Sequence, residues 1–334
     1  MKPSMQTSKP LASLSLDLDN KWSYMKTHGD AGWESFPSYL DVAVPRILNF
    51  LKARGLTITF FVVGQDAALG KNKEALGQIA AAGHEIGNHS FHHDPWLHLY
   101  STMQIENELA SAEEHIERAT GRRPVGFRGP GFSISQTTLE VLARRSYLYD
   151  ASTFPTFVGP LARAYYFMTA NLSREEMRRR GRLYGTLRNG LQSIKPYRWQ
   201  LKAGTLIEIP ITTLPIIKVP IHLSYVLYLA NLSSTVALRY FQTALKACQL
   251  TGTQPSLLLH PLDFLGRDDA ADLSFFPGMN LPSEKKLEIV SEVLRMLSSH
   301  FVVITVGHHA REAAKALRLP LTEPSLRQLD RRVR

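Results

Sequence analysis

Cysteine is almost absent from this sequence of 334 residues, since Cys248 is the only one. No disulfide can form within the chain, which excludes the small disulfide-stapled folds and is typical of a reducing compartment. A long apolar run is also missing, because Pro215, Lys218 and Pro220 interrupt the most apolar segment, residues 214–232. The first residues lack the apolar stretch of a signal peptide. From these absences we expect a soluble, cytoplasmic protein.

Acidic residues are the scarcer charged type: 39 Lys and Arg stand against 29 Asp and Glu, a formal net charge of +10. The excess lies between Thr156 and Gly204, where ten basic residues stand against two acidic ones and seven aromatic residues are interleaved. This segment is either a solvated insertion or a surface for an anionic partner, such as phosphate, an anionic membrane or nucleic acid. No nucleic-acid-binding motif accompanies it, so we expect no nucleic-acid partner.

A histidine-rich segment, residues 83–95, holds the first candidate site. His89 and His93 are four residues apart, so on a helical turn both rings would lie on one face and could bind one metal ion. His92 leaves a second pairing with His89 open, at a spacing of three residues. An ordinary exposed helix face would show the same spacings. A metal site here needs a third ligand from elsewhere in the chain.

The segment Leu14–Asn20 offers that third ligand. Strand alternation places its leucines on one face and Ser15, Asp17 and Asp19 on the other. Two carboxylates on the same side of an apolar strand are costly unless a cation or a reaction uses them. A turn or a calcium-like loop would explain an isolated Asp-x-Asp equally well. The presence of both segments, each at the end of an apolar run, favours a metallohydrolase.

Apolar runs alternate with amphipathic segments along the chain, and 44% hydrophobic residues suffice for a full-sized core. Alternating strands and helices imply parallel pairing, and seven or eight such units favour an α/β barrel over an open sheet. We expect a single domain over residues 11–308, with an N-terminal arm at 1–10, a basic tail at 309–334 and the basic insertion at 156–204. Besides 14–20, the predicted strands are 57–63, 85–88, 124–128, 147–150, 205–209, 256–260 and 301–305, and the predicted helices include 44–54, 101–121, 135–145 and one from 283.

In a barrel of this kind the chemistry lies at the C-terminal ends of the strands. Ionisable side chains follow the apolar runs of five separate predicted strands, and this agreement predicts one shared active site. The loop after the first strand carries aromatic residues, among them Trp22, that suit the mouth of such a site. The strand-end residues are Asp17 and Asp19, His89, Arg128, Asp150 and His260.

Four short motifs in this order resemble those of the NodB-homology polysaccharide deacetylases, the carbohydrate esterase family 4 type. The resemblance runs from about Leu14 to Val306, apart from the insertion, and it selects His93 over His92 as the second histidine. A further motif of the family, which precedes these four, usually has two adjacent aspartates. This sequence departs from it, because the aspartates of Asp17-Leu18-Asp19 are separated by a leucine. The matching motifs are His89-Ser90-Phe91-His92-His93, Phe127-Arg128-Gly129-Pro130-Gly131, Tyr149-Asp150-Ala151-Ser152 and Leu258-Leu259-His260.

The resemblance implies a distorted (β/α)7-8 barrel of the NodB type and a metal-dependent mechanism. Asp19, His89 and His93 would hold a divalent metal, for which zinc is the expected ion. Asp17 would be the general base, and His260 would be the acid that protonates the leaving amine. A buried core histidine is the alternative interpretation of His260.

Further residues would support this chemistry. Arg128 would orient Asp17 through a charge-assisted hydrogen bond and would itself be steadied by Asp150. A purely structural ion pair is the alternative for Arg128. The predicted substrate-binding residues are Trp22, Pro130, Gly131 and Phe132.

The resemblance implies that the substrate is an N-acylated amino sugar. A cytoplasmic enzyme would meet free, nucleotide-linked or lipid-phosphate-linked sugars. The basic insertion and the apolar segment 216–232 favour the lipid-linked class, with peripheral contact at the inner face of the membrane. The alternatives are a non-sugar amidase of the same superfamily and a catalytically inactive carbohydrate-binding barrel.

Overall fold

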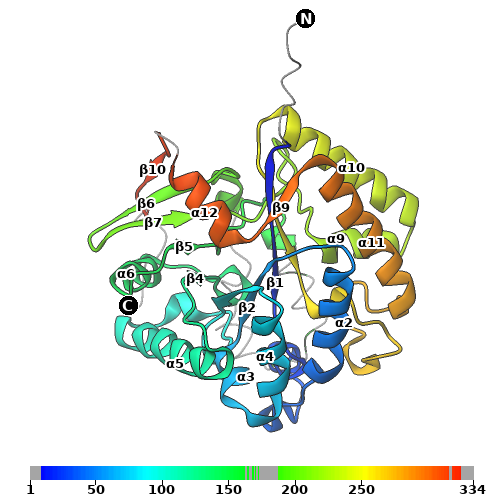
Figure 1. Cartoon of the computed structure of the whole chain (residues 1–334), viewed down its shortest axis with the longest axis horizontal. Helices are drawn as coiled ribbons and strands as arrows, with labels where there is room; N and C mark the ends of the chain where they lie inside the picture. Colours follow the sequence, from blue (N-terminus) through cyan, green and yellow to red (C-terminus); the bar gives the residue numbers. More distant parts are fainter. Residues whose placement is uncertain are drawn as a thin grey trace, which may run out of the picture.

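A ten-stranded sheet surrounded by helices forms the centre of the computed structural model (Figure 1). The structure describes residues 9–161, 164, 168, 170, 172, 187–315 and 318–324. The strands are β1 (Leu11–Asp17), β2 (Thr59–Val62), β3 (Glu85–Asn88), β4 (Gly126–Phe127), β5 (Tyr149–Asp150), β6 (Tyr197–Leu201), β7 (Gly204–Glu208), β8 (Ser256–Leu259), β9 (Val302–Ile304) and β10 (Leu321–Thr322).

The sheet follows the order β10-β6-β7-β5-β4-β3-β2-β1-β8, and β9 pairs with the first half of β1. The ladders between these strands are parallel, except that β6 and β7 form an antiparallel hairpin. Parallel pairing through crossover helices places the C-terminal ends of β1 to β5 at one edge. The predicted α/β class with a parallel sheet is confirmed.

The strand ladders do not close the sheet into the predicted barrel, which stays a prediction. No ladder joins β8 to β10, the two ends of the path through the described strands. The segment after β7 instead reaches β8. The backbone N–H of Thr212 donates to the carbonyl of Ser256 over 3.0 Å, and the N–H of Ser256 donates to Thr212 Oγ1 over 2.8 Å. The sheet therefore curls back towards β8 through two hydrogen bonds rather than through a paired strand.

Helices connect the strands and cover the outside of the sheet (Figure 1). The predicted capping box at the start of α5 is present, because Ser101 and Gln104 exchange side-chain to backbone hydrogen bonds and Gly121 ends the helix in a left-handed conformation. The helices are α1 (Lys21–His28), α2 (Leu40–Lys52), α3 (Gly64–Ala68), α4 (Lys73–Ala81), α5 (Thr102–Thr120), α6 (Gln136–Arg144), α9 (Leu223–Ala230), α10 (Ser234–Leu250), α11 (Ser283–His300) and α12 (Val306–Ala314).

Several boundaries differ from the prediction. The expected loop after β1 contains α1, which the side chain of Asn20 caps. Helix α2 begins at Leu40, so Pro45 lies inside the helix rather than in its first turn. The apolar segment 214–232 contains α9, and α10 follows it. Among the described helices, none combines the length and the apolar character that crossing a membrane requires.

The predicted domain limits stay a prediction, although regular elements of the structure lie across or beyond two of them. The end of the expected insertion, up to Gly204, includes β6, which pairs with β7 and β10. The boundary expected at residue 308 falls inside α12, and β10 follows within the predicted tail. The arginines of the insertion, Arg163, Arg174, Arg178, Arg179, Arg180 and Arg182, lie outside the described residues.

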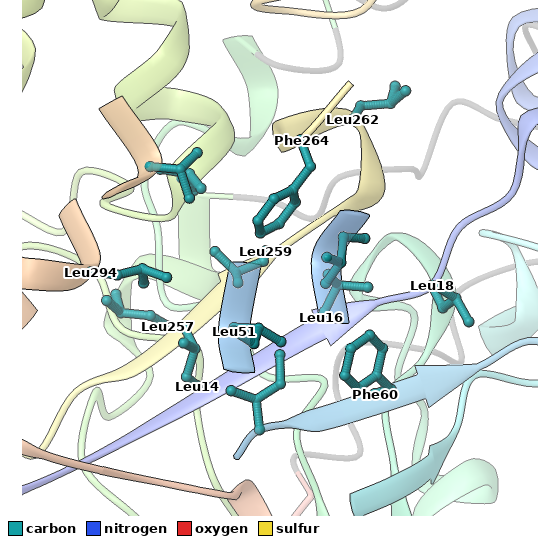
Figure 2. Close-up of a cluster of buried hydrophobic side chains, with 14 of the residues drawn as sticks. Leu14, Leu16, Leu18, Leu51, Phe60, Leu257, Leu259, Leu262, Phe264 and Leu294 are labelled. Atoms are coloured by element: carbon teal, nitrogen blue, oxygen red, sulfur yellow. The ribbon is translucent and has the colours of Figure 1, made fainter. Parts of the chain in front are cut away.

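The leucine face of β1 packs into the main hydrophobic core, as the alternation predicts. Leu14, Leu16 and Leu18 are fully buried, next to Phe60 of β2 and Leu259 of β8 (Figure 2). Burying a large apolar side chain stabilises the fold by about 1.5–3 kcal/mol. The opposite face of β1 is buried as well, and it carries the polar side chains of Ser13, Ser15 and Asp17.

Gly126 of β4 provides a test of this close packing. A Cβ atom at this position would lie 2.0 Å from Cζ of Tyr149, its buried partner on β5. We expect Gly126→Ala to destabilise the protein by about 1–3 kcal/mol, because the fully buried ring has little room to move. Gly77→Ala in α4 is the control, since a Cβ there meets nothing within 4 Å. That control should be neutral or stabilising by up to about 1 kcal/mol. Urea unfolding of both variants measures the difference, and equal stability would contradict the packing argument.

Candidate active site

Side chains from neighbouring strand ends meet at one edge of the sheet. Asp17 ends β1 and Asp19 lies two residues beyond it, whereas His89 follows β3 and Arg128 follows β4. These strands run parallel, so their C-terminal ends lie on the same side. The structure brings these four predicted residues together, and all four are buried.

Asp19, His89 and His93 form a group that suits a divalent metal. Asp19 Oδ1 lies 2.9 Å from His93 Nε2 and 3.3 Å from His89 Nε2. One ligand atom from each residue lies within 4.8 Å of the other two. His89 Nδ1 is 2.7 Å from the carbonyl oxygen of Arg128, to which it donates its proton, so Nε2 remains free as a ligand. Two imidazoles and one carboxylate are the donor set of an open, three-ligand metal site.

The two histidines do not lie on a helix, and the prediction of a helical turn was wrong. Residues 89–93 form an irregular turn in which Ser90 (φ 61°) and His93 (φ 54°) adopt left-handed backbone conformations. Asn88 Oδ1 accepts the N–H of Ser90 over 2.8 Å, and Ser90 Oγ accepts the N–H of His93 over 3.2 Å. These side-chain hydrogen bonds support the turn locally and hold the two imidazole centroids 5.0 Å apart.

His92 points away from this group. Its ring is 56% exposed and pairs through Nδ1 with the carboxylate of Glu108 on α5. Glu108 Oε2 also accepts the backbone N–H groups of Phe91 and His92, each over 3.0 Å. Glu108 therefore clamps the histidine turn from outside. Sequence reasoning missed it, although a glutamate next to the apolar stripe of α5 was a signal of a buried carboxylate.

The metal-ligand group carries concentrated charge. Burial opposes ionisation of Asp19, but the adjacent His93 and His89 outweigh it and hold the pKa of Asp19 well below its usual range. Burial likewise disfavours the charged form of His89, yet Asp17 and Asp19 raise the pKa of that imidazole overall. The Tyr39 hydroxyl donates to the carbonyl of Asp19 over 2.5 Å and anchors the segment. Asp19 is thus ionised, as a carboxylate ligand of a metal must be.

Arg128 holds Asp17 beside this group. Its Nη1 donates to Asp17 Oδ1 over 2.6 Å and to Ser15 Oγ over 2.9 Å, and its guanidinium is fully buried. The other oxygen of Asp17, Oδ2, lies 3.9 Å from His89 Nε2. One carboxylate oxygen is therefore fixed by a charge-assisted hydrogen bond, and the second faces the metal-ligand group.

Asp150 reaches this arrangement indirectly. In the described part of the chain no hydrogen bond joins its carboxylate to the guanidinium of Arg128. Instead, Asp150 Oδ1 accepts the Ser152 hydroxyl over 2.6 Å, and Ser152 Oγ accepts the N–H of Gly129 over 2.8 Å. On β7, Glu208 is the register partner of Asp150, and burial raises the pKa of both carboxyl groups. Asp150 therefore supports the turn after Arg128 rather than the guanidinium itself.

His260 follows β8 and is partly exposed. The backbone N–H of His260 donates to Asp263 Oδ2 over 2.7 Å, and the ring nitrogen Nδ1 lies 3.1 Å from Ser224 Oγ. Sequence reasoning missed both partners, and it also missed His222, whose ring centroid lies 6.4 Å from that of His260. Burial, with His260 nearby, lowers the pKa of His222 to about 3, so His222 is neutral near pH 7.

The predicted substrate-binding residues differ in accessibility. Gly131 is exposed and Phe132 half-buried, with left-handed φ values of 57° and 62°. Pro130 is buried. Trp22 is only 1% exposed, and its Nε1 donates to Asp66 Oδ1 over 3.0 Å while its ring packs edge-on against His93. Trp22 therefore supports the metal-ligand group from behind and does not line an open mouth.

Comparisons with known proteins show which proteins this chain resembles. The sequence model of the family described as polysaccharide deacetylase matches residues 30–149. A peptidoglycan deacetylase of Helicobacter pylori is 31% identical over 112 residues, which cover 34% of this chain and 37% of that protein. A peptidoglycan-N-acetylmuramic acid deacetylase of Bacillus subtilis is 35% identical over 104 residues, covering 31% and 38%. The matched part is thus well under half of either relative.

A solved structure extends the likeness over the whole fold. A Mycobacterium smegmatis protein described as a polysaccharide deacetylase superposes with a TM-score of 0.59 at 19% identity, covering 96% of this chain and 95% of that one. The predicted resemblance is confirmed: the chain has the α/β fold of this class and is related to the polysaccharide deacetylases. The family match contains His89, His93 and Arg128 but ends before His260 and begins after Asp19. The roles of the outer residues therefore depend on the geometry.

Single histidine replacements test the metal-ligand group. The His93→Ala variant should lose its divalent ion, because Asp19 and His89 alone leave only two ligands. The matched variant His92→Ala should retain about one ion per chain, because the His92 ring pairs with Glu108 outside the group. Elemental analysis of the purified variants measures the difference. Metal lost from His92→Ala and kept by His93→Ala would reverse the ligand assignment.

Proposed function

We propose that this protein is a metal-dependent hydrolase that removes an N-acyl group, acetyl above all, from an amino sugar. The observation that carries the proposal is that two groups of side chains lie next to each other at one edge of the sheet. The Asp19, His89 and His93 side chains form a metal-ligand group, and Asp17 lies beside it with one oxygen fixed by Arg128. The relation to polysaccharide deacetylases supports an amide of an acetylated sugar as the substrate.

The protein's own residues would divide the proton transfers. Zinc or another divalent ion, when bound, supplies Lewis acidity towards the amide carbonyl and the attacking water. Asp17 Oδ2, which faces the metal-ligand group, accepts the proton of that water as general base. Arg128 holds Asp17 in this orientation through a hydrogen bond to Oδ1. His260, at the end of β8, donates a proton to the leaving amine. The products are a carboxylate and the free amino sugar.

We further propose a lipid-phosphate-linked sugar at the inner face of a membrane as the substrate. Exposed apolar side chains in the segments before and after α9 support this class, because Ile216, Ile217 and Leu232 are 84%, 57% and 85% exposed. The basic residues of the insertion would contact phosphate or anionic headgroups, at up to about 1 kcal/mol each. Nucleotide-linked sugars also carry phosphate, but they have no lipid chain that would contact these apolar side chains.

Asparagine replacements separate base from ligand. Asp17→Asn should keep the metal but lower the turnover of an N-acetylated sugar by about 10²–10⁴-fold, because the amide cannot accept a proton. Asp19→Asn should lose metal affinity as well as turnover, since Asp19 contacts both histidines. Metal content and turnover are measured on the same preparations. Equal metal loss in both variants would make Asp17 a ligand and remove it as the base.

The substrate class can be tested with a panel of N-acetylated free, nucleotide-linked and lipid-phosphate-linked sugars, with products identified by mass spectrometry. We expect release of acetate and turnover of the lipid-linked sugar above the others. Replacing Arg178, Arg179, Arg180 and Arg182 by Ser should raise KM for phosphate-bearing substrates at low salt and leave a small uncharged substrate unaffected. If the protein turns over only free sugars, and the quadruple variant turns them over as wild type does, the lipid-linked substrate class is refuted. The proposed deacetylase activity is not. No amide hydrolysis anywhere in the panel would refute the deacetylase.

A further inference from the structure

We propose that Ser224 is a positioning residue for His260, which connects the Asp263 carboxylate to the imidazole and determines which ring nitrogen carries the proton. The catalytic consequence of this arrangement rests on the proposed function, in which His260 is the acid. The protonation pattern of the ring does not, and it can be measured without any substrate or metal.

The three residues come from two separate segments. His260 follows β8, and Asp263 lies three residues further on, at the end of a short 3₁₀ turn. Asp263 Oδ2 accepts the backbone N–H of His260 over 2.7 Å, and Asp263 Oδ1 accepts the Ser224 hydroxyl over 3.0 Å. Ser224 is the second residue of α9, and its Oγ lies 3.1 Å from His260 Nδ1. A single hydroxyl thus connects the carboxylate and the ring.

The direction of these hydrogen bonds follows from the donors available. A serine hydroxyl has one hydrogen, and a carboxylate can only accept. The hydrogen of Ser224 therefore points to Asp263, and its oxygen accepts a hydrogen bond from His260. The backbone N–H of Asp263 bonds the carbonyl of His260 over 3.0 Å, so with the Asp263 carboxylate ionised the proton of the neutral imidazole lies on Nδ1. Nε2 is left as the nitrogen that takes up a proton and can deliver it to a leaving amine.

Buried surroundings hold the relay in place. Ser224 is 5% exposed and Asp263 1% exposed, so water competes little for their hydrogen bonds. The Lys286 ammonium lies beneath the turn, where it donates to the carbonyls of Leu262 and Leu265 over 2.7 and 2.8 Å. This buried cation fixes the backbone on both sides of Asp263 and adds positive charge near the carboxylate.

A serine hydroxyl in a helix commonly bonds a nearby backbone group of its own segment. The Ser224 hydroxyl instead makes both of its hydrogen bonds across to the 260–263 turn. The N-cap of α9 is His222, with no side-chain capping bond, so removing the Ser224 hydroxyl does not remove a cap. The first turn of α9 therefore contributes this hydroxyl to the surroundings of His260.

Imidazole ¹⁵N NMR of the metal-free protein, at a pH of about 8, tests the relay directly. The His260 signals are assigned with the variant His260→Gln. We expect wild type and Ser224→Thr to show the Nδ1–H form, whereas Ser224→Ala should shift towards the Nε2–H form. Ser256→Ala is the control, because the hydroxyl of this buried serine, on the strand before His260, has no hydrogen-bond partner among the described residues, so its loss should leave the ring unchanged. An Nε2–H form in wild type, or an unchanged Nδ1–H form in Ser224→Ala, would overturn the proposal.

Kinetics of the metal-loaded variants separate this inference from the function on which it builds. Ser224→Ala should lower kcat by roughly 10–100-fold with little change in KM or bound metal, and Ser224→Thr should restore most of it. If Ser224→Ala changes the tautomer of His260 but leaves kcat unchanged, the positioning role of Ser224 is supported and His260 is refuted as the acid. A lowered kcat in both Ser224→Ala and Ser224→Thr, with the Nδ1–H form retained throughout, would refute the relay.

Discussion

The buried cation of Arg128 is the interaction on which the rest of the site depends. Its guanidinium donates to Ser15 and Asp17 on β1 and to the carbonyl of Ala151 after β5, and its own carbonyl accepts the Nδ1 proton of His89 after β3. A buried charge that loses its partner is strongly destabilising, so these strand ends are held together electrostatically. The same bonds orient Asp17 and leave Nε2 of His89 available as a candidate metal ligand. Structural and chemical roles are thus joined in one side chain.

Much of this architecture could be predicted because the signals were local. The alternation in β1 separates the buried leucines from Asp17 and Asp19, and short apolar runs located the strands that end at His89, Arg128 and His260. Parallel strands end at one edge, so the candidate site followed from topology alone. The capping box at Ser101 likewise depends on residues three positions apart.

The remaining features depend on contacts between distant segments, which no local pattern reports. Glu108 is 16 residues from the His92 ring that it binds, and Ser224 is 36 residues from His260. The left-handed turn at Ser90 overrides the helical spacing of the histidines, because Asn88 and Ser90 satisfy its backbone. Trp22 was expected at an open surface, but Asp66 accepts its indole N–H in the interior.

The pairing of β1 has a consequence for biosynthesis. This first strand lies between β2 on one side and β8 on the other, and the Ser15 hydroxyl bonds the carbonyl of Leu257, 242 residues later in the chain. As the chain leaves the ribosome, β1 can pair with β2 early, but its other edge stays unpaired until most of the protein has been made. A growing chain therefore exposes an apolar strand edge for most of its synthesis, the kind of edge at which misassembly begins and which chaperones protect.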